Sequence, residues 1–295
     1  METAVNAFLS ALKAEPAYST STQLAYANDL RVFLNYLNDI EVRSPHYDDL
    51  NTEQVAKFLE TERELGRRRS TLVRRLATLT YFQDYLVNQG LLTSEKLSPA
   101  DHKIQQVVSK VAQTEPPKCL SERQVQELLA ILESSPRPRA LRDRAIFVLL
   151  LETGLSVASL TALDMTDIDL SARRLHIFLP GVGDLWMDMG EAHMPIEEYI
   201  NEGRPNLLHK PGERALFISQ MDGRLSRQGV WQILKYWGEQ ARPAIPLSPR
   251  LVRHSAALRM KGAGMSNTDI QKRLGHENIL STQALLRRLE ASCSS

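Results

Sequence analysis

The 295-residue chain has little cysteine, little net charge and no long apolar run. Its two cysteines, Cys119 and Cys293, show neither the CxxC nor the Cys/His spacing of a metal site, so we expect two reduced thiols and no bound metal. No run approaches the roughly 18 apolar residues that cross a membrane. The N-terminus lacks the basic start and apolar core of an export signal, which predicts a cytoplasmic protein without membrane association.

The charges nearly cancel, leaving a net charge of +1 and a pI near 7.8. This balance argues against a protein that coats polyanions without specificity. If DNA is the partner, the basic side chains must be gathered at particular places. Hydrophobic residues make up 43% of the chain and charged residues 24%, which is the mix of an ordinary globular protein of one or two domains.

Apolar residues recur at three- and four-residue spacings in the first hundred residues. This period predicts helices over 20–38, from about residue 51, and over 70–88. In the first of these we expect Leu24 to face inward, and in the second we expect Thr52 to be the N-cap. The sequence therefore predicts a small helical bundle.

A polar stretch over 105–118 ends in two prolines, which stop a helix and favour extended chain. We therefore predict a helical domain over 1–107, a linker over 108–118 and a second domain over 119–295.

The second half mixes helices and strands. Ser121 is expected to cap a helix, and the strongly apolar residues 141–152 predict a buried one. Two short strands are expected within 174–189 around a Pro-Gly-Val-Gly turn, and another over 214–218. Four further helices are predicted over 226–241, 249–263, 266–274 and 279–290. The predicted fold is mainly α with a small antiparallel sheet, an α+β class.

Several ordered stretches resemble the tyrosine recombinase, or phage integrase, family, and within it the Xer-like recombinases. They are LLLETGLSVASLTALDMTDIDL (149–170), LFISQMDGRLSRQGVWQILKYWGEQA (216–241), PRLVRHSAALRMKGAGMSNTDIQKRLGHENILSTQALL (249–286) and the N-terminal pair STSTQLAYANDLRVFLNYL (19–37) and RRRSTLVRRLATLTYFQDYLVNQG (67–90). The resemblance covers nearly the whole chain. It implies a helical DNA-grasping domain followed by a catalytic-type domain.

The family's reaction transfers a DNA phosphoryl group to a tyrosine oxygen, with fixed cationic donors on the phosphate oxygens and without a metal or other cofactor. Most of the positions that the resemblance assigns to this chemistry hold other residues. They are Ser156 for the first arginine, Ser159 for its acidic support, Val182 for the turn lysine and Leu285 for the tyrosine. Arg253 and His276 are retained, and Arg250 stands where the family has a histidine.

Loss of the nucleophile and two donors predicts a catalytically inactive family member that binds double-stranded DNA. The resemblance points to DNA contacts by two groups of arginines: Arg67, Arg68, Arg69, Arg74 and Arg75, and Arg224 and Arg227. The first group also reads as a solvated charge cluster, because glutamates at 60, 62 and 64 partly neutralise it.

Such a protein is expected to act as an accessory or regulatory subunit in site-specific recombination or integration. It would self-associate or assemble with an active recombinase through its last helix, as the family does. Two alternatives stay open. One is an active enzyme with a non-standard site or a partner's nucleophile. The other is a protein-interaction module without DNA binding, which docks through Ile279, Leu280, Leu285, Leu286 and Leu289.

Overall fold

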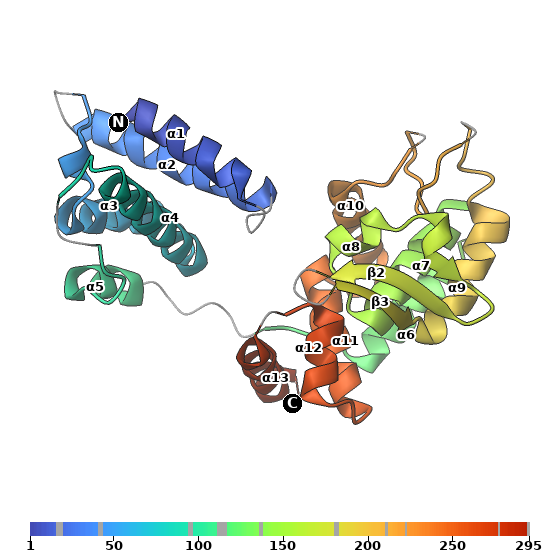
Figure 1. Ribbon diagram of the computed structural model, residues 1–295. Coiled ribbons are helices and arrows are strands. Elements are labelled where there is room, and N and C mark those ends of the chain that lie inside the picture. The colour runs from blue at the N-terminus through green and yellow to red at the C-terminus, as the bar shows by residue number, and fades with distance from the viewer. Residues whose placement is uncertain are drawn as a thin grey trace. The chain divides into compact units, whose positions relative to one another are not determined.

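The computed structural model describes residues 1–15, 20–40, 44–93, 97–110, 117–135, 138–179, 183–209, 212–221, 223–276 and 278–293. The chain divides into two compact units, Met1–Glu115 and Pro116–Ser295 (Figure 1). Each unit has its own hydrophobic core. Within the described ranges, no helix is long and apolar enough to cross a membrane.

The first unit is a helical bundle with a short 3-10 turn. Its elements are α1 (Glu2–Ala14), α2 (Thr20–Ile40), η1 (Tyr47–Asp49), α3 (Thr52–Glu64), α4 (Arg69–Asn88) and α5 (His102–Lys110). Leu30, Phe33 and Leu37 line one face of α2 and are almost fully buried. The ring of Phe33 meets Phe58 of α3 edge-on, with centroids 5.2 Å apart. The three predicted helices are thus confirmed.

Two local predictions in this unit are wrong, and one boundary differs. Leu24 is 68% exposed, because six residues of helix amount to about 600° and place it a third of a turn away from Leu30. Asn51, not Thr52, caps α3, since its side chain accepts a 3.0 Å hydrogen bond from the Gln54 amide. Helix α5 runs into the predicted linker, and residues 111–116 of that linker lie outside the described residues.

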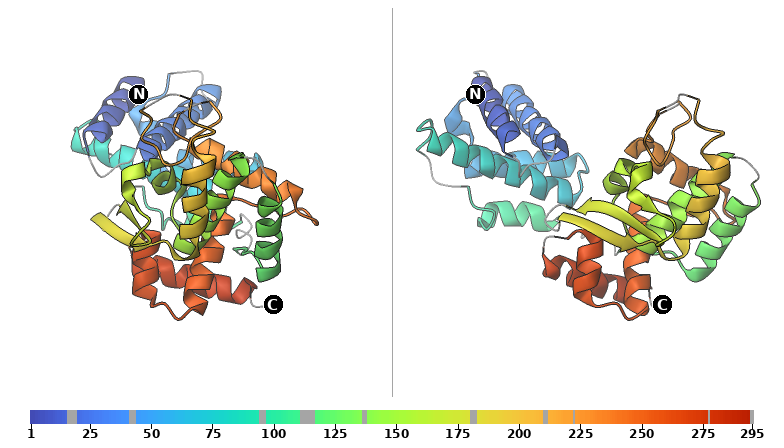
Figure 2. Two further views of the ribbon diagram at one scale, coloured as in Figure 1. Left: turned by 90° about the vertical axis from the view of Figure 1, so that its right-hand side faces the viewer. Right: turned by 45° about the vertical axis from the view of Figure 1, so that its right-hand side comes forward.

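The second unit is mostly helical around a small sheet. Its elements are α6 (Glu122–Glu133), α7 (Pro138–Thr153), α8 (Val157–Ala162), η2 (Met165–Asp167), β1 (Ile168–Asp169), β2 (Arg174–Leu179), β3 (Gly183–Asp188), η3 (Gly190–Ala192), α9 (His193–Glu198), η4 (Tyr199–Gly203), α10 (Arg227–Gln240), α11 (Pro249–Gly262), α12 (Asn267–Leu274) and α13 (Ile279–Cys293). Figure 2 shows α11, α12 and α13 gathered at one end of this unit. The predicted mainly α fold with a small sheet is confirmed.

The sheet is antiparallel in the order β1-β2-β3. Along β2, Leu175 and Ile177 are buried while Phe178 is exposed, which is the period-2 alternation of a strand covered on one face. His176 lies opposite Trp186 of β3. The pair of strands predicted within 174–189 is therefore confirmed.

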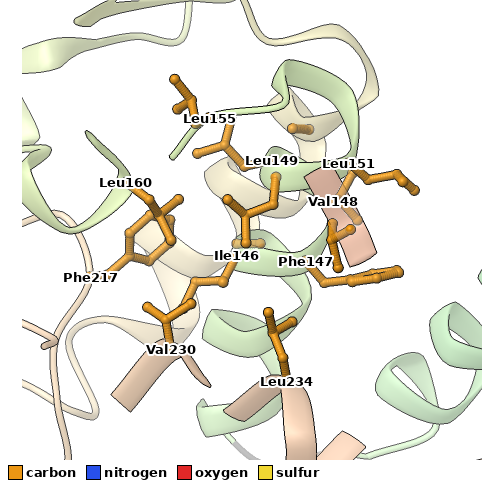
Figure 3. Close-up of a cluster of buried hydrophobic side chains, with 14 of the residues drawn as sticks. Ile146, Phe147, Val148, Leu149, Leu151, Leu155, Leu160, Phe217, Val230 and Leu234 are labelled. Carbon is orange, nitrogen blue, oxygen red and sulfur yellow. The ribbon is translucent and has the colours of Figure 1, made fainter. Parts of the chain in front are cut away.

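Helix α7 is the central element of the second core (Figure 3). Ile146, Phe147 and Leu149 are at most 1% exposed, and α7 contacts α6, α9, α10 and α11. Full burial of each such side chain contributes about 1.5–3 kcal/mol. The buried helix predicted over 141–152 is confirmed.

The strand expected over 214–218 is wrong. This segment makes only isolated bridges, Asp164 with Ala215 and Ile218 with Arg224. A side chain completes its pairing, because the Tyr199 hydroxyl donates to the Leu216 carbonyl and accepts from the Ile218 amide, both at 3.1 Å. The Leu216 carbonyl and the Ile218 amide thus have hydrogen-bond partners without a strand ladder.

The expectation of two separate reduced thiols is also wrong. Cys119 and Cys293 form a disulfide, with Cα atoms 6.2 Å apart. The spacing of 174 residues gave no sign of it, because only the folding of α13 beside the segment that precedes α6 brings the two residues together.

Candidate functional site

Arg253 projects from α11 and ties two chain turns together. Its guanidinium donates to the Gly154 carbonyl at 2.9 Å and to the Leu274 carbonyl. Gly154 follows α7 with a φ of +65°, a left-handed conformation that favours glycine, and an added Cβ would lie 2.9 Å from a Leu274 methyl, which would have to shift. Burial lowers the pKa of Arg253, which nevertheless stays cationic at neutral pH.

His276 follows the left-handed Gly275 that terminates α12. Its Nδ1 lies 2.9 Å from the hydroxyl of Thr282, which is fully buried in the first turns of α13. Burial, assisted by the positive charge of Arg253, lowers the pKa of His276 below its ordinary 6.5. The imidazole is therefore neutral at physiological pH and bonded to α13.

His254 is buried behind Arg253 on the same helix. Its Nδ1 contacts the Lys118 carbonyl at 3.3 Å, and its Nε2 accepts from Nε of the exposed Arg250 at 3.4 Å. These contacts favour the tautomer with the proton on Nδ1. Burial is the main cause that lowers the pKa of His254, and the nearby arginines act in the same direction.

Ser156 and Ser159 hydrogen-bond to one another at the start of α8. Ser156 is the N-cap, and its hydroxyl accepts from the Ser159 amide at 3.0 Å and lies 2.9 Å from the Ser159 hydroxyl. A helix cap of this kind contributes about 1 kcal/mol. This corner of the unit therefore holds two hydroxyls in place of a charged pair.

Leu285 lies on α13 and is partly buried against the apolar cluster that α11, α12 and α13 share. Its side chain has no oxygen, so it offers no nucleophile to a phosphate. Val182 lies outside the described residues. The sequence has no lysine over 174–189, and in the described ranges no group of three or more His, Cys, Asp or Glu side chains could hold a metal ion.

Arg67, Arg68 and Arg69 form the turn into α4. Arg67 and Arg68 are exposed and Arg69 is half-buried. Nε of Arg67 lies 3.4 Å from a carboxylate oxygen of Glu62, whose side chain is only 6% exposed. Arg67 and Arg68 therefore present exposed cations at this turn, although Arg67 also pairs with the buried Glu62.

Arg74 and Arg75 point into the helical bundle instead. Arg74 pairs with Asp29, which is 1% exposed, and Arg75 pairs with Glu62 and lies 3.4 Å from Asp29. Burial raises the pKa of Asp29 despite these cations. A guanidinium buried as Arg75 is cannot reach a DNA phosphate, so the predicted contact at this position does not fit the structure.

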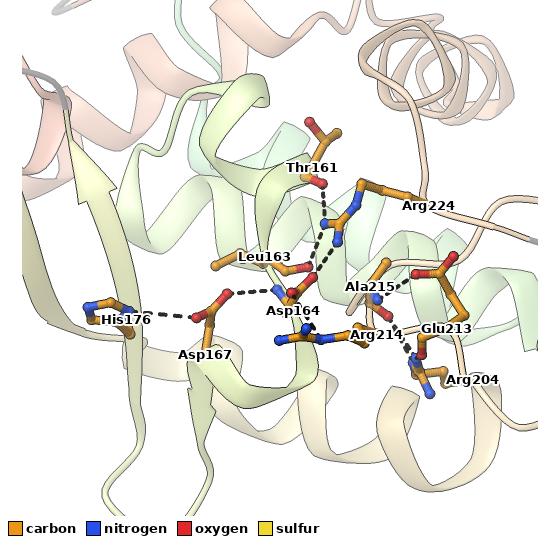
Figure 4. Close-up of polar contacts among 10 residues, drawn as sticks. All are labelled: Thr161, Leu163, Asp164, Asp167, His176, Arg204, Glu213, Arg214, Ala215 and Arg224. Carbon is orange, nitrogen blue, oxygen red and sulfur yellow. Dashed lines mark hydrogen bonds and ion pairs between the residues drawn. The ribbon is translucent and has the colours of Figure 1, made fainter. Parts of the chain in front are cut away.

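Arg224 and Arg227 flank the start of α10. The Arg224 guanidinium donates to the Thr161 and Leu163 carbonyls at 2.9 and 3.1 Å and pairs with Asp164 (Figure 4). Arg224 thus fastens its loop to the end of α8. Arg227 is exposed on the first turn of α10.

Comparison with known proteins identifies the family of this chain. Residues 118–290 match the model described as Phage integrase family, and residues 5–90 match Phage integrase, N-terminal SAM-like domain. The chain belongs to the phage integrase family of tyrosine recombinases. It is 34% identical to tyrosine recombinase XerC of Roseiflexus castenholzii, over 96% of this chain and 88% of that one. It is 31% identical to tyrosine recombinase XerD of Halalkalibacterium halodurans, over 94% and 90%.

Solved structures of the family share the fold. A Tn1549 transposon integrase in complex with transposon right end DNA aligns with a TM-score of 0.73 at 19% identity, covering 96% of this chain and 94% of that one. A lambda integrase dimer bound to a COC′ core site aligns at 0.66 and 17%, covering 97% and 95%.

In this phage integrase unit, Arg253 links the turn before Ser156 to the turn before His276, and Thr282 contacts His276 from α13. The retained residues are therefore brought together, next to the helix that carries Leu285. Thr282 carries no signal in the sequence that marks it as a partner of His276. Its contact with His276 was missed because it depends on how α13 packs.

Proposed function

We propose that this chain is a DNA-binding member of the phage integrase family that does not exchange DNA strands. It would act as an accessory or regulatory subunit in site-specific recombination. The observation that supports this proposal most is Leu285, an apolar residue packed among apolar neighbours at the position the family resemblance assigns to the nucleophile.

The donors support the same proposal. Where the resemblance expects a phosphate-binding arginine, Ser156 caps α8. The Arg253 guanidinium already donates to two backbone carbonyls. Removal of one fixed hydrogen-bond donor from an active site typically lowers the reaction rate by about 10²–10³. A nucleophile supplied by a partner would still meet a site without the first arginine.

DNA binding is supported by exposed cations and by relatives. Arg67, Arg68 and Arg69 are not buried, and Arg227 is exposed on a second element. The aligned Tn1549 and lambda integrases are described with DNA bound. We propose that Arg67–Arg69 contact phosphates, that the protein acts in the cytoplasm where chromosomal DNA lies, and that it assembles with an active recombinase.

Sequencing the DNA that remains bound to purified protein tests specificity. The selected site then serves in a salt titration of the wild type and of a variant with Arg67, Arg68 and Arg69 changed to Gln. Each lost phosphate contact makes the slope of log K against log salt less negative by about 0.9. The slope of the variant should therefore be less negative than that of the wild type by up to about 2.7. A charge-matched control changes Lys13, Arg31 and Lys103, exposed residues of α1, α2 and α5, to Gln.

Two outcomes would redirect the proposal. If the protein does not bind DNA at physiological salt, the alternative of a protein-interaction module would replace the proposal. Strand exchange that appears on mixing with an active XerC-type relative, and that requires Arg253 of this chain, would indicate a working site with a borrowed nucleophile.

A further inference from the structure

The disulfide between Cys119 and Cys293 fastens the last helix to the segment that precedes α6. Cys293 is the last residue of α13, and Cys119 lies in residues 117–120, here called the connecting segment. The Cα separation of 6.2 Å lies within the range that a disulfide spans. Both cysteines are half-buried at the edge of the small apolar cluster that α11, α12 and α13 share.

Other contacts hold the connecting segment between α11 and α13. The Ser292 hydroxyl of α13 donates to the Pro117 carbonyl at 2.6 Å. From the α11 side, the Ser255 hydroxyl accepts from the Leu120 amide at 2.7 Å, and His254 contacts the Lys118 carbonyl. The connecting segment is therefore hydrogen-bonded to both α11 and α13.

Apart from the connecting segment, α13 is attached to its unit through few buried side chains. Its fully buried side chains are Thr282, Leu286 and Leu289, a single stripe at helical spacing. Leu286 and Leu289 belong to a small apolar cluster that is separate from the main core of the unit. Leu280 on the same helix is 61% exposed. A helix with one short apolar stripe is held weakly, so a covalent link at its end contributes a large share of its attachment.

We propose that Cys119 and Cys293 form a redox-operated clasp that keeps α13 packed on its own unit, and that reduction loosens this helix. Since Thr282 of α13 bonds His276, loosening α13 also releases one edge of the candidate site. The clasp goes beyond the proposed function and does not depend on it, because neither cysteine lies at a position assigned to catalysis or to DNA.

The reaction is thiol–disulfide exchange with a dithiol reductant. One thiolate of the reductant attacks a sulfur of the pair and forms a mixed disulfide, while the departing cysteine takes a proton. The second reductant thiol, after losing its proton, attacks the mixed disulfide and frees the other cysteine, which is then protonated. Two electrons and two protons pass to the protein, and the reductant leaves as its own disulfide.

The test uses the full-length protein after mild oxidation with oxidised glutathione, with and without dithiothreitol. Labelling with N-ethylmaleimide under denaturing conditions should add no label to the oxidised protein and two labels after reduction. Hydrogen exchange should then show amides of residues 285–293 exchanging at least about tenfold faster in the reduced protein.

A Cys119→Ser, Cys293→Ser double variant is the matched control, and its exchange should not respond to dithiothreitol. Because the comparison between oxidation states is made on the wild-type protein, the proposal remains testable even if the variant folds poorly. Two labels on the oxidised protein, or equal exchange of residues 285–293 in both oxidation states, would overturn the proposal.

Discussion

Changing Arg253 to Met should destabilise the second unit, whatever its role toward DNA. The guanidinium donates to the Gly154 and Leu274 carbonyls, and hydrogen bonds from charged groups contribute about 1.5–3 kcal/mol each. Part of this gain is offset by the cost of burying the cation, the same cost that lowers its pKa. We therefore expect a loss of about 2–4 kcal/mol in the free energy of unfolding.

Urea titration followed by tryptophan fluorescence measures this loss, because all three tryptophans lie in the second unit. With roughly 3 °C per kcal/mol for a domain of this size, Tm should fall by about 6–12 °C. Arg259→Met on the same helix is the control, since that exposed arginine pairs mainly with an exposed Glu122 and should cost under about 1 kcal/mol. Equal stability of the two variants would refute a structural role for Arg253.

Three further changes test other contacts. His254 and His276 have pKa values below their ordinary 6.5, so below that pH the unfolded chain binds more protons, and unfolding free energy should fall as pH drops from 7.5 toward 5.5. Urea midpoints should fall less over this range after both are changed to Asn. Arg75→Met removes the buried cation that pairs with Glu62 and lies near Asp29, and should cost about 3–5 kcal/mol in circular dichroism melts of the first unit, whereas exposed Arg68→Met should cost almost nothing. Gly154→Ala should lower Tm, because the left-handed conformation costs a residue with a Cβ about 1–2 kcal/mol; an unchanged Tm would contradict the positive φ at this position.

Periodicity predicted α2 because its burial is one-sided, and an unbroken apolar run predicted α7 because that helix is buried on all sides. The stripe of Leu30, Phe33 and Leu37 and the run around Phe147 both reflect packing against a single core or complete burial. The segment 214–218 shows where this reasoning stops. Its apolar residues are buried, but Tyr199 from another element completes their hydrogen bonding, and no local pattern encodes that partner.

The candidate site was predictable as a set of residue types but not as a set of contacts. The family resemblance pointed to Arg253 and His276, and the structure brings them to neighbouring turns. The sequence did not indicate that Arg75 would be turned inward to Glu62, because helical arginines on either face look alike in sequence. The sequence also did not indicate the disulfide between Cys119 and Cys293, because it depends on packing between distant segments.

We propose that this chain forms no covalent link to DNA, because Leu285 stands where the family resemblance places the tyrosine. A duplex carrying the selected site with a nick, so that the cleaved end diffuses away, traps any protein–DNA link for detection on a denaturing gel. The wild type should give no covalent band under conditions in which an active XerC-type relative does. Leu285→Tyr should also give none, because Ser156 supplies no cation to the phosphate. A covalent band from the wild-type chain would contradict the account.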